Sequence, residues 1–180
     1  LIDKKVFSLR NKYIKKFGFA KEIVVGLTEN KFEGSIDPGK MIFSLKKKLD
    51  SLGVDCYFST EVESFEETSK KIYLKLKSSN QSIDIKTNKL VICTNAFAKK
   101  WFDMEDISPG RGFILLTNKI PDLKINGCFH YNGGYYYFRN IGKRLLLGGG
   151  REIDIKNETT YSFGINNRIR QKLIEDLKRF

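Results

Sequence analysis

The sequence predicts a mixed α+β protein, in which an α/β segment, a three-stranded β-meander and an antiparallel sheet follow one another along the chain. Apolar residues recur at intervals of three and four over residues 41–52, which is typical of one face of a helix. Between residues 62 and 85 they alternate with polar residues in three runs, which is typical of amphipathic antiparallel strands. From residue 113 onward, further short apolar runs are separated by turn residues, and these predict the antiparallel sheet.

The N-terminal segment predicts a helix followed by a short strand. Residues 1–17 carry apolar side chains at helical spacing, and Gly18 would end this helix. Residues 23–28 are rich in β-forming residues, and residues 29–34 read as a polar turn.

A second helix is predicted from its boundary residues. Asp37 can accept backbone N–H bonds as the N-cap, and Pro38 suits the first helical position. Gly53 would end the helix, and residues 54–59 would form the strand that completes half of an α/β unit.

Residues 90–93 (Leu-Val-Ile-Cys) form a continuous apolar run, which is typical of a strand buried on both faces. The run stops at Thr94, Asn95 and Ala96, which are small or polar. In open α/β sheets, ligands bind beyond the carboxyl ends of strands, so a ligand could lie at this point. An ordinary strand end is the alternative.

The second half of the chain predicts one or two helical turns over 96–102 and a break at 108–112, where Pro and Gly gather. Four strands are predicted near residues 113–117, 127–131, 134–139 and 144–149. The final segment predicts a helix, because its apolar residues fall on one stripe: Ile165, Ile169, Leu173, Leu177 and Phe180.

Composition narrows the classes of function. The net charge of +12 comes from 33 Lys and Arg against 21 Asp and Glu, but the lysines are scattered, so solvated faces are favoured over a nucleic-acid surface. No apolar run is long enough for a membrane span. Three separated cysteines and one histidine give no metal-binding pattern, and they predict buried thiols in a reducing compartment, the cytoplasm. The chain starts without Met and stops on a helix, as expected for an internal piece of a longer protein.

Five segments together resemble the D-amino acid oxidase-like family of FAD-dependent oxidoreductases, which includes glycine and sarcosine oxidases. They lie at residues 34–41, 53–62, 90–96, 108–113 and 135–149. The order and spacing of the segments carry the resemblance. The glycine-rich GxGxxG turn and the C-terminal segment that closes over the flavin have no counterpart in the sequence.

The resemblance implies one domain that binds FAD and one that binds the substrate. Residues 37–107 would belong to a partial FAD-binding domain with the three-stranded β-meander, and residues 1–36 and 108–180 to an antiparallel-sheet substrate domain. Val62 would contact the adenine of FAD through its backbone, although it can also serve as a core residue of the meander. Thr94, Asn95 and Ala96 would let the backbone approach the dinucleotide. No metal is implied.

On the substrate side, Tyr131 and Tyr135 resemble the pair of tyrosines that contact the substrate in amino-acid oxidases. Phenol hydroxyls can orient a carboxylate or an amine. The alternative is that residues 135–137 are strand residues whose rings pack in a sheet. Strand alternation places Tyr135 and Tyr137 on one face and Tyr136 on the other, so Tyr137 is a further candidate. Arg139 matches a basic position of the family and would bind substrate or support the strand. No residue is assigned as catalytic.

Two further residues are predicted to have structural roles. Arg111 is expected to form a salt bridge or to pack at the domain crossing. His130 is expected to be a hydrogen-bonded structural residue, although its place next to Tyr131 would also let it line the cavity.

The implied function is the oxidation of a small amine or amino acid, with hydride passing to FAD in the full-length protein. Two alternatives stay open. One is a basic RNA-binding or tRNA-modifying flavoprotein module, and the other is a non-catalytic relative. A homo-oligomer is compatible with the sequence, and the substrate and the electron acceptor are not specified by it.

Overall fold

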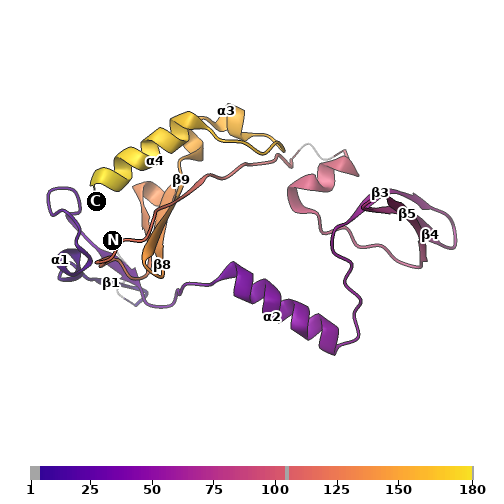
Figure 1. Ribbon diagram of the computed structural model, residues 1–180, viewed down its shortest axis with the longest axis horizontal. Helices are drawn as coiled ribbons and strands as arrows, with labels where there is room; N and C mark the ends of the chain where they lie inside the picture. Colours follow the sequence, from indigo (N-terminus) through magenta and orange to yellow (C-terminus); the bar gives the residue numbers. More distant parts are fainter. Residues whose placement is uncertain (1–4, 104–105, 180) are drawn as a thin grey trace. The chain divides into compact units, whose positions relative to one another are not determined.

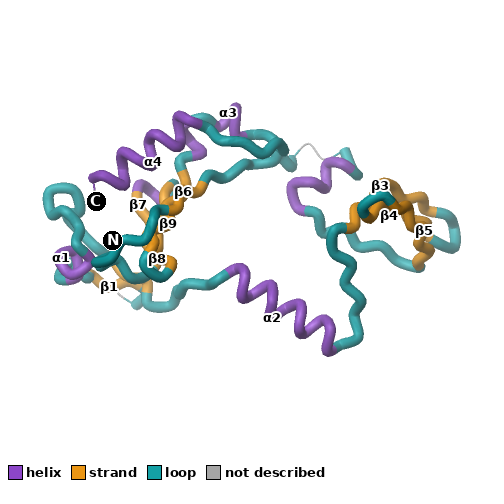
Figure 2. The backbone as a smooth tube through the Cα atoms, in the orientation of Figure 1, coloured by secondary structure: helices purple, strands orange, loops and turns teal. Residues whose placement is uncertain are grey.

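The computed structural model describes residues 5–103 and 106–179, and the chain divides into two compact units. Unit 1 comprises Leu1–Ser35 with Lys99–Phe180, and unit 2 comprises Ile36–Ala98. The combination of helices with antiparallel sheets confirms the predicted α+β class (Figures 1 and 2).

Unit 1 is built on a four-stranded antiparallel sheet, as predicted. Its strands are β6 (Ile114–Leu116), β7 (Cys128–Tyr131), β8 (Tyr136–Ile141) and β9 (Arg144–Gly149), in the order β6-β9-β8-β7. The turn between β8 and β9 contains Gly142 at φ 56°, in the left-handed region that glycine adopts without strain. A short 3₁₀ turn, η2 (Asn132–Gly134), joins β7 to β8.

The core of unit 1 lies between this sheet and the predicted C-terminal helix, α4 (Asn167–Arg179), which runs beside β8 and β9 in Figure 1. Ile169 and Leu173 of α4 are buried, Leu173 to 0% exposure. Ile165 precedes the helix and is 70% exposed, so the buried face of the helix is shorter than the predicted apolar stripe. Phe180, the last residue of that stripe, lies outside the described residues. The helix packs on side chains of alternating sheet positions, namely Tyr136, Phe138, Leu145 and Leu147.

A buried ion pair ties the start of β6 to the segment before α4. This segment contains η3 (Arg151–Ile153) and α3 (Ile155–Glu158). Arg111 donates to both carboxylate oxygens of Glu158 at 2.9 and 2.8 Å, and Glu158 is only 1% exposed. Asn166 donates to the same carboxylate at 2.8 Å, while its side-chain oxygen accepts from the backbone N–H groups of Arg168 and Ile169 at the start of α4. The salt bridge expected for Arg111 is therefore confirmed.

The helix predicted over residues 1–17 is wrong for residues 5–12, and residues 1–4 lie outside the described residues. Residues Phe7–Leu9 form strand β1, which pairs with β2 (Thr28–Asn30), and only α1 (Tyr13–Phe17) is helical. Asn11 lies between β1 and α1, and its side chain accepts from the Leu27 N–H at 2.9 Å. Pairing with a segment some twenty residues away overrides the local periodicity.

The two predictions that follow in the chain also need correction. Residues 23–27 form a turn and an irregular segment instead of a strand. The strand β2 begins at Thr28, the last residue of the predicted strand, and continues into the predicted polar turn 29–34. The end of α1 is as expected, since Gly18 caps it at φ 82°.

Unit 2 contains α2 (Pro38–Ser51) and the predicted β-meander. Asp37 caps α2 by accepting from the Lys40 N–H at 3.1 Å, as predicted, yet no residue of the helix is buried. The meander consists of β3 (Thr60–Glu67), β4 (Ile72–Ser78) and β5 (Gln81–Thr87), paired in chain order with a bulge between Val62 and Ser64.

Two predicted strands of unit 2 are wrong. Residues 54–59 and 90–93 are irregular, and Val91 is 80% exposed. A strand buried on both faces needs a neighbour with which to pair, and no described segment pairs with either run. The predicted helical turns after the second run are confirmed as the 3₁₀ helix η1 (Asn95–Lys100).

The predicted burial of the cysteines is also wrong. Cys93 and Cys128 are exposed and Cys56 is half-buried, because the strand expected around Cys93 does not form and Cys128 lies on the uncovered face of the sheet. Within residues 5–103 and 106–179, no helix has the length and apolarity of a membrane span.

The packing of α4 predicts a large effect of truncating its central side chain. Leu173→Ala should lower the free energy of unfolding of unit 1 by about 2–5 kcal/mol, because it removes buried methyl groups and leaves a cavity. Ile165→Ala, at the exposed position before the helix, should change it by less than about 0.5 kcal/mol. Urea unfolding followed by circular dichroism measures both, and equal effects would contradict this packing.

The Arg111–Glu158 pair predicts a pH dependence of stability. Hydrogen bonds from Arg111 hold the pKa of Glu158 below its ordinary value, so the pair stabilises the fold at neutral pH, and this stabilisation is lost as the pH falls below about 4. Arg111→Met leaves a buried unpaired carboxylate and should lower the melting temperature at pH 7, with the gap to wild type closing on acidification.

Arg10→Met provides the matched control for this pH experiment. It removes an exposed pair with Glu29 at 2.7 Å, and an exposed pair contributes little to stability. A similar loss in both variants at pH 7 would contradict the role assigned to Arg111.

Candidate functional site on the open face of the sheet

The four-stranded sheet of unit 1 has one covered face and one open face. Phe129, Tyr131, Tyr136 and Phe138 point to the face that packs beneath α4 and α1, where their rings lie 4.9–6.1 Å apart. Strand alternation then places the intervening residues on the other face, and Ile114 and Leu116 of β6 are exposed there. The residues that share the open face are Ile114, Leu116, Cys128, His130, Tyr137, Arg139, Ile141, Arg144, Leu146 and Gly148.

Tyr137 lies across Gly148 on the open face. The two residues are paired between β8 and β9, and a Cβ atom at Gly148 would lie 2.5 Å from both Cζ and the hydroxyl oxygen of Tyr137. The absence of a side chain at Gly148 therefore lets the phenol ring lie flat over β9. This contact sets the position of the Tyr137 hydroxyl on the open face.

Arg139 is one of two arginines on this face, and Arg144 of β9, which donates to the Thr117 carbonyl oxygen, is the other. Arg139 lies two residues after Tyr137 on β8, opposite Cys128 on one side and Leu146 on the other. Its Nε reaches the Asn140 carbonyl oxygen at 3.5 Å, a long contact at the limit of a hydrogen bond. A phenol hydroxyl and a guanidinium thus occupy the same face of one strand.

His130 contributes to the same row of the sheet. It is paired with Tyr137, and their ring centroids are 6.3 Å apart at an interplanar angle of 44°. The structure places this histidine on the open face, where it is exposed, beside a candidate substrate-binding tyrosine. Its predicted structural role stays a prediction.

Tyr131 lies on the covered face. Its hydroxyl donates to Asp176 of α4 at 2.8 Å, and burial together with this carboxylate raises the pKa of Tyr131 far above its ordinary value. Asp176 is itself buried and pairs with Lys172. The substrate contact predicted for Tyr131 stays untested, and its hydroxyl is already engaged by a carboxylate.

Tyr136 and Tyr135, the neighbours of Tyr137 in the sequence, lie in different surroundings from it. Tyr136 is buried under α4, where burial and Glu152 raise its pKa, and this is the face opposite to Tyr137, as alternation predicted. Tyr135 precedes β8 and is 59% exposed. Sequence reasoning missed Asp176 and Glu152, since each lies on another element far along the chain and carries no local signal.

The residues predicted to contact FAD lie in unit 2. Val62 is half-buried in β3, at the edge of the meander and beside the bulge. Asn95 adopts φ 48°, a left-handed conformation that glycine, and among other residues asparagine, tolerates best. Thr94 and Ala96 flank it.

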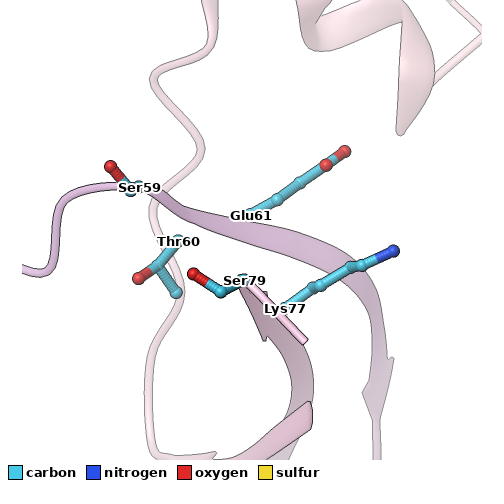
Figure 3. Close-up of a pocket in the computed structure, with 5 residues that line it drawn as sticks. All are labelled: Ser59, Thr60, Glu61, Lys77 and Ser79. Atoms are coloured by element: carbon cyan, nitrogen blue, oxygen red, sulfur yellow. The ribbon is translucent and has the colours of Figure 1, made fainter. Parts of the chain in front are cut away.

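A polar hollow of about 480 Å³ lies where β3 begins and β4 ends (Figure 3). Ser59 and Ser79 border it, both with left-handed backbones at φ 54° and 53°. Thr60, Glu61 and Lys77 complete its lining. The hollow is open, so it presents polar groups near Val62 without enclosing a ligand.

The fold and this open face define a mixed α+β protein with an antiparallel sheet that presents polar and charged side chains on one side. The family model described as FAD dependent oxidoreductase matches residues 13–180. The chain belongs to this family, and the resemblance found in the sequence is confirmed. No curated protein matches the chain.

The described residues fit one part of an FAD site. Unit 2 offers the edge of β3, the hollow beside it and the left-handed backbone at Asn95, where a dinucleotide could approach. A glycine-rich turn opening a helix, which would hold the pyrophosphate, does not occur between residues 5 and 103 or 106 and 179. The described chain therefore supplies contacts for the cofactor but no phosphate cradle.

The glycines of β9 predict two different outcomes of adding a methyl group. Gly148→Ala should displace the Tyr137 ring at a modest cost, about 1–3 kcal/mol, because the clash is with the end of a side chain. At Gly149 the backbone has φ 115° and a Cβ would lie 2.1 Å from the Tyr135 carbonyl oxygen, so Gly149→Ala should cost more. Urea unfolding of both variants tests this order, and a reversed order would contradict it.

Proposed function

We propose that the protein acts in the oxidation of a small amino acid or amine, with the open face of unit 1 binding the substrate. The observation that carries the proposal is the pairing of a phenol and a guanidinium on one uncovered face, with Tyr137 held over Gly148. Membership of the FAD dependent oxidoreductase family supports the reaction class.

Arg139 is the proposed anchor of a substrate carboxylate. A guanidinium offers several N–H donors in a fork that matches a carboxylate, and its positive charge persists at every physiological pH. The apolar side chain of Leu146 lies opposite it in β9. This arrangement favours amino acids over simple amines.

Tyr137 is the proposed orienting group for the rest of the substrate. Its hydroxyl can donate to a carboxylate or accept from an amine without adding a charge. His130, in the next strand, borders the same position. When bound, FAD would supply the acceptor for a hydride from the C–H group next to the amine, and water would hydrolyse the protonated imine that remains.

The cofactor-side residues are proposed to act through backbone positions. Val62 would offer its extended backbone to the adenine, and Asn95 between Thr94 and Ala96 would allow a close approach of the chain. The cytoplasm is the proposed location, since all three cysteines are free thiols.

The direct experiment is spectroscopic. The protein purified from its native gene should show the visible absorbance of a flavin, and anaerobic addition of a substrate amino acid should bleach it. A protein that stays colourless and cannot be reconstituted with FAD would exclude the oxidase function.

Variants of the open face separate carboxylate binding from chemistry. Arg139→Met should raise KM for an amino acid roughly 10- to 100-fold, the effect of losing a charge-assisted hydrogen bond, and leave KM for the matching amine without a carboxylate nearly unchanged. Tyr137→Phe should raise KM for both substrates, by about tenfold or less.

Arg170→Met provides the control for these kinetics, because Arg170 is an exposed arginine of α4, and α4 covers the other face of the sheet. Its kinetic constants should match those of wild type. An equal loss for the amino acid and the amine in Arg139→Met would contradict the assignment of the carboxylate to Arg139.

A further inference from the structure

The surplus of positive charge is concentrated on unit 1, where 23 Lys and Arg face 13 Asp and Glu. Several of the acidic residues are already paired. Glu29 pairs with Arg10, Glu158 with Arg111 and Asp176 with Lys172. The uncompensated charge of this unit must therefore lie on other lysines and arginines.

A group of such lysines surrounds α1. No acidic residue occurs between Asp3 and Glu22 in the sequence. The helix buries Ile14 and packs Phe17 against Phe129 at 5.2 Å, which turns Lys12, Lys15 and Lys16 to the solvent.

The Tyr13 ring and Lys124 extend this surface. The ammonium groups of Lys12 and Lys16 lie 5.5 and 5.1 Å from the centre of the Tyr13 ring. The stem of Lys124 lies against Gly18, where a Cβ would meet its Cδ at 3.5 Å. Among the described residues, none of these lysines forms an ion pair. We call Lys12, Tyr13, Lys15, Lys16 and Lys124 the α1 surface.

The stability of the helix does not account for all of these charges. Lys15 and Lys16 lie in its last turn, where a cation interacts favourably with the helix dipole. Lys12 stands at the N-cap, makes no capping bond and lies at the end where a cation is unfavourable. Its charge therefore opposes helix formation, and the contact that the structure gives it is with the Tyr13 ring.

We propose that the α1 surface binds the sugar-phosphate backbone of single-stranded nucleic acid. Lysines around an aromatic ring are the combination that such strands use, with phosphates on the ammonium groups and a base against the ring. Lys12 and Lys16 are one helical turn apart on the same side of α1, so they can contact neighbouring phosphates. This surface is formed by other elements than the open face of the sheet, and the proposal stands independently of the oxidase function.

Salt-dependent binding of a fluorescent oligouridylate of about 12 nucleotides tests the proposal, with fluorescence anisotropy as the readout. The triple variant Lys12→Gln, Lys15→Gln, Lys16→Gln should bind at least ~10-fold more weakly at low salt. The slope of log K against log salt concentration should fall in magnitude by about 2, since each lost phosphate contact on a single strand accounts for about 0.7.

A second triple variant provides the matched control, Lys70→Gln, Lys75→Gln, Lys89→Gln, which removes the same charge from exposed positions of unit 2. Its affinity and slope should stay close to those of wild type. The single variant Lys12→Gln, which does not weaken the helix, should reduce the slope by about 0.7 and keeps the test valid if the α1 triple variant unfolds.

Three results would overturn the proposal. They are no salt-dependent binding of oligouridylate by the wild type, an equal loss in both triple variants, and binding only to vesicles that contain phosphatidylserine. The last result would assign the α1 surface to a membrane.

Discussion

The buried carboxylate of Glu158 is the group on which the architecture of unit 1 depends. Removing a carboxylate from water is costly unless a positive charge and hydrogen bonds compensate it. Arg111 supplies the charge and two hydrogen bonds, and the neutral amide of Asn166 supplies a third. Asn166 also caps α4, so the same group fixes the start of β6 and the start of the helix. With α4 held on one face of the sheet, the face that carries Tyr137 and Arg139 is left open.

Those parts of the fold whose local pattern agrees with their surroundings could be predicted from the sequence. The meander, the four strands of unit 1, the capped start of α2 and most of α4 follow directly from alternation, periodicity and Asp37. The failures share one cause. Whether residues 7–9 or 90–93 form strands depends on a distant partner, and β1 has one in β2 whereas the run at Val91 has none among the described residues.

The candidate site could be predicted from the sequence to about the same extent as the fold. Alternation alone separates Tyr136 from Tyr137, and it leads from Tyr137 to Arg139 on the same face. The contact with Gly148 requires the register between β8 and β9, and the bond from Tyr131 to Asp176 joins residues 45 positions apart. Neither leaves a trace in the local sequence. Asn95 is an intermediate case, because an asparagine before a helical turn suggests a left-handed backbone that only the structure shows.

The two exposed cysteines have a practical consequence. Cys128 belongs to unit 1 and Cys93 to unit 2, so each unit carries one accessible thiol. Replacing the half-buried Cys56 by serine would leave a protein with one attachment point for a dye or a spin label on each unit. The spacing of the two units then becomes a distance that resonance energy transfer or electron spin resonance can follow in solution.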